Sequence, residues 1–390
     1  MKNLKSLLFA GVSVLATGLA AGEPESQELK YRNLILENEF LSVSLLPESM
    51  GRIDQITVKK NHYNILYPRH SLCTDYGSLL KTVKGNAFGS ADTFLQRDVR
   101  SIDQKMEVEQ PDPQTVIFSV NNYGGMPITM TRKITLPENS TVIRTESKLQ
   151  WHGKADSEIT PRWDFFLNGG DPLPSRQNLF IPLVRLDGGD GKYDRLHRWK
   201  QRTVVPSDNF MAVIIPPQDL TFALIVDPDS LQQGSKFYTL SSGYNSRWYW
   251  WMAFMLPPQK MDPDTVREYS FELAVYPGLK NLHEICGDIA MYAYVTKHSQ
   301  PWRLGVVMMA ARPVAPCTVT LRMTPEDGKP LEKSFNLPQL SPGKLHNITW
   351  TLSGFPAGKY HISGNIPVRG DFSFPEPVIE MKPAAPAKDE

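Results

Sequence analysis

Apolar and polar residues alternate along most of this chain, and helical periodicity is almost absent after the first 22 residues. The clearest alternating runs lie at 115–120, 128–136 and 141–149, and each has the length of a strand. Turn-forming clusters at 121–125 and 137–140 separate these runs. Short runs with a period of two, divided by turns, predict an all-β protein built as a sandwich or a barrel.

Further strands follow in the middle of the chain. Runs at 211–215 and 221–226 predict a strand pair, and a long run at 269–276 predicts a strand that closes this region before Gly278. Residues 279–298 contain the one stretch with helical spacing, because their apolar positions recur every three or four residues. We therefore predict a linker with a short helix over 279–298.

A family resemblance begins at the strand-like run 39–46. This run leads into the segment 47–53 (PESMGRI), and a second alternating run leads to the segment 63–67 (YNILY). The pattern resembles the opening of galactose mutarotase-like (aldose 1-epimerase-like) proteins, which are large β-sandwiches that bind sugars. In strand-and-turn rhythm the resemblance extends from about Glu28 to Gly278. It implies a supersandwich and a carbohydrate ligand, but it names no reaction, because one fold carries many functions.

A second, smaller β-region is predicted over 299–374. It ends in the segment 354–362 (GFPAGKYHI), which resembles the last hairpin of a small immunoglobulin-like sandwich. The tail 375–390 is rich in proline, alanine and charge, so we predict that it is disordered. The predicted organisation is therefore a mutarotase-like supersandwich over 23–278, the linker, and an immunoglobulin-like β-sandwich over 299–374.

The first 22 residues predict a signal peptide. Lys2 and Lys5 precede an apolar run of about 15 residues that ends in small residues. This run is shorter than the roughly 20 residues that a membrane-spanning helix needs. We predict export with cleavage close to Ala20–Gly22, and hence a periplasmic or extracellular protein without a stable membrane span.

Composition narrows the choice of partners and cofactors. The 42 basic and 41 acidic side chains nearly cancel, which argues against nucleic acid or an anionic membrane as partner. Cys73, Cys286 and Cys317 lack metal-site spacing, so one disulfide with an odd thiol and three buried free thiols both stay open. We predict no cofactor and no metal, although the Asp- and Gly-rich loop 187–194 is either a turn or a Ca²⁺ site.

Two segments carry the candidate sugar-binding residues, which pair flat aromatic faces with fixed donors and acceptors. These residues are Arg162, Trp163, Asp164, Asn168, Arg247, Trp248 and Trp250. Aromatic rings cover the C–H face of a sugar, and the polar groups satisfy its hydroxyls. His197 joins the set as the histidine best placed for acid–base work, and the basic residues beside it suit the carboxylate of a uronic acid.

The geometry expected of this site follows from strand alternation. One face of the predicted strand carries Trp248, Trp250 and Met252, and the other carries Tyr249, Trp251 and Ala253. At least one of these faces must be core, and the pattern leaves open which aromatic set faces a ligand. We predict that Arg162 and Asp164 meet the Trp248 and Trp250 face in one cleft. We also expect Asp164 to face solvent.

The resemblance implies a glutamate base and a histidine acid, which this chain lacks at the matching places. Segment 246–255 holds no carboxylate, the loop 85–92 holds no histidine, and Arg162-Trp163 stand where the family's histidine is expected. We therefore predict a carbohydrate-binding protein that works in polysaccharide or sugar processing. Two alternatives stay open: an active carbohydrate enzyme, epimerase-like or a lyase or hydrolase accessory, and a structural protein whose C-terminal module binds a protein partner.

Overall fold

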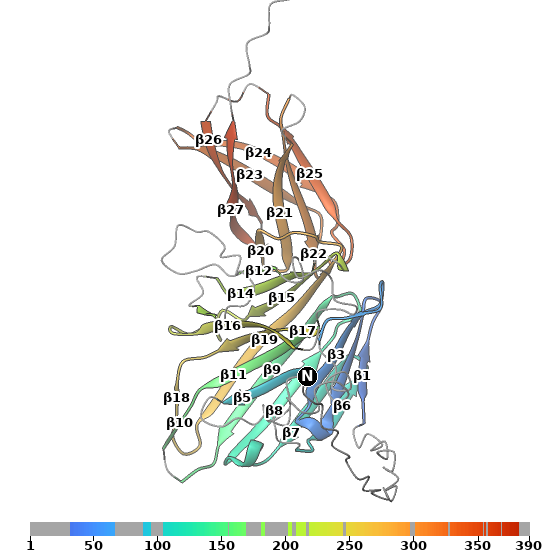
Figure 1. The fold of residues 1–390 in the computed structure, drawn as a ribbon, viewed down its shortest axis with the longest axis vertical. Coiled ribbons are helices and arrows are strands. Elements are labelled where there is room, and N and C mark those ends of the chain that lie inside the picture. Colours follow the sequence, from blue (N-terminus) through green and yellow to red (C-terminus); the bar gives the residue numbers. More distant parts are fainter. Residues whose placement is uncertain are drawn as a thin grey trace, which may run out of the picture. The chain divides into compact units, whose positions relative to one another are not determined.

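The computed structural model describes residues of the unit Tyr31–Glu390 only. The described residues are 32–66, 89–94, 104–154, 156–168, 181–183, 202–204, 208–215, 218–244, 247–296, 301–326, 328–353, 355, 358–367 and 369–381. The predicted signal peptide, Cys73, His197 and the loop 187–194 lie outside them. Apart from two short 3₁₀ helices, η1 (Pro47–Ser49) and η2 (Tyr123–Gly125), every described regular element is a strand (Figure 1). The predicted all-β fold class is confirmed.

Two antiparallel sheets account for most of the chain before Gly278 (Figure 1). In spatial order, the eight-stranded sheet consists of β12 (Ile181–Leu183), β14 (Phe210–Ile215), β15 (Leu220–Val226), β19 (Val266–Pro277), β9 (Val142–Trp151), β8 (Ile128–Thr135), β7 (Thr115–Val120) and β6 (Glu107–Asp112). The five-stranded sheet consists of β13 (Arg202–Val204), β16 (Lys236–Tyr244), β17 (Arg247–Met255), β11 (Pro161–Asn168) and β5 (Ser90–Phe94). The strands predicted from alternation before Gly278 are therefore confirmed.

One apolar core lies between these two sheets. Phe165 and Phe254 of the five-stranded sheet belong to the same buried cluster as Phe222 and Leu273 of the eight-stranded sheet. Because side chains on a strand alternate between its faces, each sheet has an inner face in this core and an outer face. Charged residues such as Lys133, Arg144 and Glu146 lie on the outer face of the eight-stranded sheet.

Four shorter strands open this region: β1 (Leu34–Glu37), β2 (Leu41–Leu46), β3 (Arg52–Val58) and β4 (Tyr63–Asn64). The turn between β2 and β3 needs glycine at its end, because Gly51 has a φ of 63° and a Cβ there would lie 2.8 Å from the ring of Phe118. A separate pair joins β10 (Ser157–Ile159) to β18 (Gln259–Met261).

The C-terminal region is built from two four-stranded sheets. One consists of β20 (Glu284–Cys286), β21 (Ile289–Thr296), β22 (Arg303–Ala310) and β25 (His346–Thr351). The other consists of β24 (Leu331–Leu337), β23 (Cys317–Pro325), β26 (Gly358–Ile366) and β27 (Gly370–Met381). Both contribute to an apolar core of their own, in which Met308 and Trp350 lie in one cluster with Leu321 and Phe372. An immunoglobulin-like relationship for this sandwich stays a prediction.

The predicted helix at 279–298 is wrong, because β20 and β21 occupy most of that range. The start of β21 is buried on both faces: Ile289 and Met291 lie in the C-terminal core, while Ala290 lies in a second apolar cluster with Tyr276 and Phe210 of the eight-stranded sheet. A strand that is buried on both faces loses its polar alternation, so its sequence pattern cannot be told from that of a buried helix.

The predicted disordered tail is also wrong in its first part. Strand β27 continues to Met381 and pairs with β26, where Ile379 lies opposite Tyr360 and Met381 lies opposite Gly358. The composition of 375–381 does not reveal this pairing, because the hydrogen-bond partner comes from elsewhere in the chain. Residues 382–390 lie outside the described part.

The two described cysteines should react very differently. Cys286 and Cys317 are free thiols, and burial, followed by the nearby charge of Glu284, raises the pKa of Cys286 to about 11. Because the thiolate is the reactive form, we expect iodoacetamide at pH 8 to modify Cys317 at least about tenfold faster than Cys286. Peptide mass spectrometry measures both rates. In urea the two rates should converge, and equal rates in the native protein would contradict the burial of Cys286.

Candidate functional site

The two segments singled out from the sequence are neighbouring strands of the five-stranded sheet. Strand β11 pairs with β17 in an antiparallel register that aligns Arg162 with Met255, Asp164 with Ala253 and Phe166 with Trp251. Directly opposed residues project to the same side of a sheet. Arg162, Asp164 and Trp251 therefore share the outer face of the five-stranded sheet.

Positions 248 and 250 belong to the other alternating series of β17. That series continues with Met252 and Phe254, which are buried in the core between the two large sheets. The side chains of Trp248 and Trp250 lie outside what the structure describes, so their meeting with Arg162 and Asp164 in one cleft stays a prediction. Among the described side chains of β17, it is Trp251 that meets Asp164.

Trp163 is a core residue and not a ligand-facing one. Its side chain is 3% exposed and stacks on Phe254 with ring centroids 5.6 Å apart. Tyr269 contacts the same ring edge-on at 5.4 Å. The predicted sugar-binding role of Trp163 is wrong, because its position in β11 projects inward. The side chains of Asn168, Arg247, Trp248 and Trp250 lie outside what the structure describes.

We define the Arg162 cluster as Arg162, Asp164, Tyr238 and Trp251. Nε of Arg162 donates a hydrogen bond of 2.6 Å to Oδ1 of Asp164, and Nε1 of Trp251 donates one of 2.8 Å to the same oxygen. The guanidinium carbon of Arg162 lies 4.5 Å from the ring centroid of Trp251 and 5.0 Å from that of Tyr238. The side chain of Asp164 is 0% exposed and that of Arg162 is 11% exposed, so the expectation of a solvent-facing Asp164 is wrong.

This arrangement holds Arg162 rigidly and leaves part of its donor capacity for something else. Asp164 uses Nε, and the two aromatic rings restrict the plane of the guanidinium through cation–π contact. Within the part of the chain that the structure describes, Nη2 of Arg162 is buried and has no hydrogen-bond partner. A buried donor without an acceptor is costly, and an oxygen atom of a ligand would satisfy it.

A second charged pair, missed by the sequence reasoning, lies at the inner face. Nη2 of Arg132 forms an ion pair with Oδ2 of Asp92, and Nη1 donates 3.1 Å hydrogen bonds to the carbonyls of Met50 and Gly51. The pKa of Asp92 lies above its ordinary value, because burial outweighs the opposing charge of Arg132. A signal was present in the sequence, since position 132 falls in the alternating series of β8 that is otherwise apolar.

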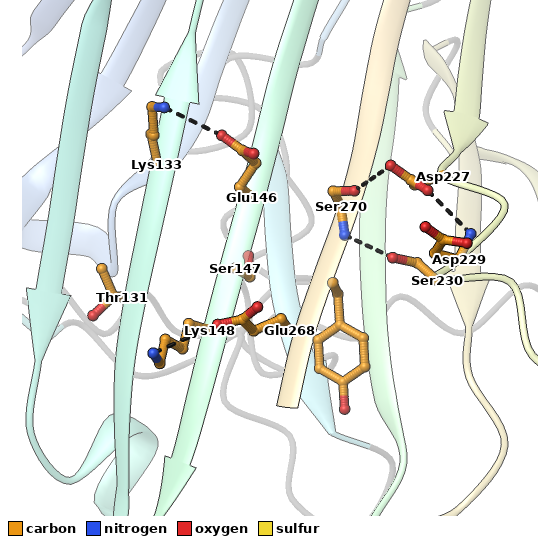
Figure 2. A pocket seen from close by; sticks show the side chains of 11 residues that line it. Thr131, Lys133, Glu146, Ser147, Lys148, Asp227, Asp229, Ser230, Glu268 and Ser270 are labelled. Atoms are coloured by element: carbon orange, nitrogen blue, oxygen red, sulfur yellow. Dashed lines mark hydrogen bonds and ion pairs between the residues drawn. The ribbon is translucent and has the colours of Figure 1, made fainter. Parts of the chain in front are cut away.

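A hollow of about 510 Å³ opens on the outer face of the eight-stranded sheet (Figure 2). It is lined by side chains of β8, β9 and β19 and by the turn that follows β15. Figure 2 shows Lys133 beside Glu146 and Ser270 beside Asp227. Nζ of Lys133 lies 3.4 Å from Oε2 of Glu146, and the hydroxyl of Ser270 donates a 2.9 Å hydrogen bond to Oδ2 of Asp227. These two pairs are already satisfied, whereas Oγ of Ser147 and the hydroxyl of Tyr269 in the same lining have no hydrogen-bond partner among the described residues. We rank the hollow below the Arg162 cluster, because the unpartnered donor of that cluster belongs to a charged group.

The described residues contain no group of three His, Cys, Asp or Glu side chains that could hold a metal ion. No helix in the same part of the chain is long and apolar enough to cross a membrane. The loop 187–194, for which a Ca²⁺ site and a simple turn were both predicted as possible, lies outside the described residues.

No family profile matches this chain, and no curated protein sequence matches it either. Its fold is similar to a TPR-domain containing protein from Parabacteroides distasonis, with a TM-score of 0.49 and 10% identity over 62% of this chain and 46% of that one. A galactose mutarotase related enzyme from Lactobacillus acidophilus gives a TM-score of 0.47 and 8% identity over 63% of this chain and 98% of that one. A galactose mutarotase-like protein from Clostridium acetobutylicum gives the same TM-score and identity, over 63% and 96%.

Galactose mutarotase-like proteins, the group that the sequence resembles, are thus among the solved structures that this fold resembles. At identities of 8–10% and TM-scores below 0.5, the likeness places this chain in no family. It also assigns the chain no activity.

Proposed function

We propose that this protein binds carbohydrate on the outer face of its five-stranded sheet, at the Arg162 cluster. The observation that carries the proposal is the buried Nη2 of Arg162, which lacks a hydrogen-bond partner among the described residues. The resemblance of the sequence opening to sugar-binding β-sandwiches supports the ligand class. Sugars present the hydroxyl and ring oxygens that such a donor requires.

The cluster is suited to binding because its donor is already in place. Asp164 and the rings of Tyr238 and Trp251 hold the guanidinium, so an arriving ligand does not have to order a flexible arginine side chain. Asp164 also balances the charge of Arg162. The guanidinium can therefore donate a hydrogen bond to an uncharged sugar hydroxyl as well as to a carboxylate. A partly exposed Trp251 adds apolar surface beside the donor.

We propose binding without turnover at this cluster. Acid–base catalysis needs groups that exchange protons near neutral pH, and arginine stays protonated throughout that range. Asp164 accepts two hydrogen bonds on one oxygen and is 0% exposed, so it positions Arg162 and does not itself meet a ligand. The cluster therefore supplies a fixed cation, held by a buried carboxylate, and no group placed to exchange a proton with a ligand.

Arg162→Lys should weaken glycan binding about 10- to 100-fold, because a charge-assisted hydrogen bond contributes roughly 1.5–3 kcal/mol. Lysine keeps the charge but lacks the planar Nη edge. A glycan array identifies the ligand for the wild-type protein, and titration calorimetry then compares Kd values.

Arg144→Lys is the matched control, because Arg144 lies on the outer face of the other large sheet with its side chain 46% exposed. Its Kd should equal that of the wild type. An array without any bound glycan, or an Arg162→Lys variant that binds as the wild type does, would refute the proposal. A polarimetric assay with common aldoses should show only the uncatalysed rate of mutarotation.

A further inference from the structure

The outer face of the sheet formed by β20, β21, β22 and β25 carries two adjacent tyrosines. Two cross-strand rows define this face: Tyr292, Val307 and Asn347 in one, and Tyr294, Gly305 and Thr349 in the next. Both tyrosines are partly exposed. On one side the rings pack against the apolar cluster that joins this face to the eight-stranded sheet and contains Val307 and Met309, so they have a firm support.

Tyr294 lies flat against the sheet because Gly305 leaves room for it. A Cβ at Gly305 would lie 2.3 Å from Cζ of the Tyr294 ring, so the ring occupies the space above that glycine. On the far side of β22, Nδ2 of Asn347 donates a 3.1 Å hydrogen bond to the hydroxyl of Tyr294. The ring therefore extends across β22 from β21 to β25, with one face against the sheet and the other turned outward.

Tyr292 extends this aromatic surface. Its ring centroid lies 6.3 Å from that of Tyr294, and the two ring planes are inclined by 40°. Packing from below and the Asn347 hydrogen bond restrict the rotamers of the pair, so a ligand would meet a preformed surface. Two neighbouring rings that support each other can contact two successive units of a polymer.

We propose that this face is a second carbohydrate-binding surface, and that it takes an uncharged polysaccharide. Exposed aromatic rings match the C–H faces of sugars, while the hydroxyl of Thr349 and the amide of Asn347 match their hydroxyls. The face comprises positions 292, 294, 296, 303, 305, 307, 347, 349 and 351. Arg303, at one end, is the sole charged residue among these nine described positions, so an anionic polymer finds little to pair with.

A protein partner fits this face less well. The neighbours of Tyr294 in its own row and in the row of Arg303 include Thr296, Thr349 and Thr351. The apolar patch is therefore small and bordered by hydroxyls. Stable protein interfaces bury roughly 1,200–2,000 Å² and have a continuous apolar centre. A polysaccharide needs only the rings and a few hydrogen-bond partners.

Affinity gel electrophoresis of the full chain tests the inference, with hydroxyethylcellulose, galactomannan and amylopectin as uncharged polymers and polygalacturonate as the anionic comparison. The wild type should be retarded by at least one uncharged polymer. Tyr294→Ala should raise the apparent Kd for that polymer about tenfold, because one stacking ring is lost. Tyr292→Ala should act in the same direction, and Tyr294→Phe, which keeps the ring, should stay within about threefold of the wild type.

Arg144→Lys, on the outer face of the eight-stranded sheet, serves as the control and should be retarded like the wild type. Loss of array binding in Arg162→Lys concerns the Arg162 cluster, and loss of retardation in Tyr294→Ala, with Arg144→Lys unaffected, concerns the tyrosine face. Absence of retardation in all three uncharged polymers overturns the inference. Retardation by polygalacturonate alone, or equal retardation of wild type and both alanine variants, also overturns it.

Discussion

Arg132→Met is expected to lower the free energy of unfolding by about 3–5 kcal/mol, the cost of breaking a buried ion pair by removing one partner. The substitution leaves the carboxylate of Asp92 buried, with only the weaker influences of Trp163 and Arg52 to favour its charged form. It also removes the donor to the carbonyls of Met50 and Gly51. Urea unfolding followed by tryptophan fluorescence measures the loss.

The same substitution on the neighbouring strand is the control for Arg132→Met. Arg144→Met changes an exposed side chain paired with Glu146 and should cost no more than about 0.5 kcal/mol. Without Arg132, burial should raise the pKa of Asp92 further above its unfolded value. A raised carboxyl pKa favours the folded state at low pH, so the deficit relative to wild type should shrink as the pH falls towards the unfolded pKa. Equal losses in the two variants would show that Arg132 is not a buried anchor.

Asp164→Leu is expected to destabilise the protein by about 3 kcal/mol or more, since it leaves the guanidinium of Arg162 without its anion. The indole N–H of Trp251 loses its acceptor as well. Asp164→Asn should cost less, about 1 kcal/mol, because the amide oxygen can still accept both hydrogen bonds. Thermal and urea unfolding of the two variants against the wild type give these values.

Two further variants make this prediction specific. Asp156→Leu removes a carboxylate that is 62% exposed and pairs with Lys260, and it should cost within about 0.5 kcal/mol. Arg162→Met combined with Asp164→Leu should recover at least half of the loss, because replacing both members of a buried pair removes the unbalanced charge. If the double variant is no more stable than Asp164→Leu alone, the ion pair is not the source of the loss.

Particular residues show how far sequence patterns predict this site. The pairing of β11 with β17 brings together two segments that the sequence had selected on the family resemblance and on residue type, and Asp164 and Trp251, 87 residues apart, meet in one hydrogen bond. Trp163 was selected for the same reason and lies in the core. Residue type indicates what a side chain can bind, but its accessibility depends on which face of the sheet it occupies.

The Arg132 and Asp92 pair illustrates the opposite error. An arginine in an apolar series is usually taken as a surface residue, and its buried partner lies 40 residues away on a different sheet. Nothing local in the sequence joins these two residues. The fold brings them together. The turn at Met50 and Gly51 then supplies the carbonyls that complete the hydrogen bonds of Arg132.

The sequence by itself determined the all-β class and the positions of most strands, because alternation and turn residues express local backbone chemistry. It did not determine β20 and β21, whose apolar run reflects burial on two faces, or the last residues of β27, whose partner strand is distant. Only the tertiary structure decided that Met252 and Phe254 of β17 are core residues and that Trp251 meets Asp164. It also decided that Asp164 is buried against Arg162, and that the ring of Tyr294 lies over Gly305. The physical reason is the same in each case. Contacts between strands far apart in the chain decide which face of a strand is buried, and alternation with a period of two does not say which face that is.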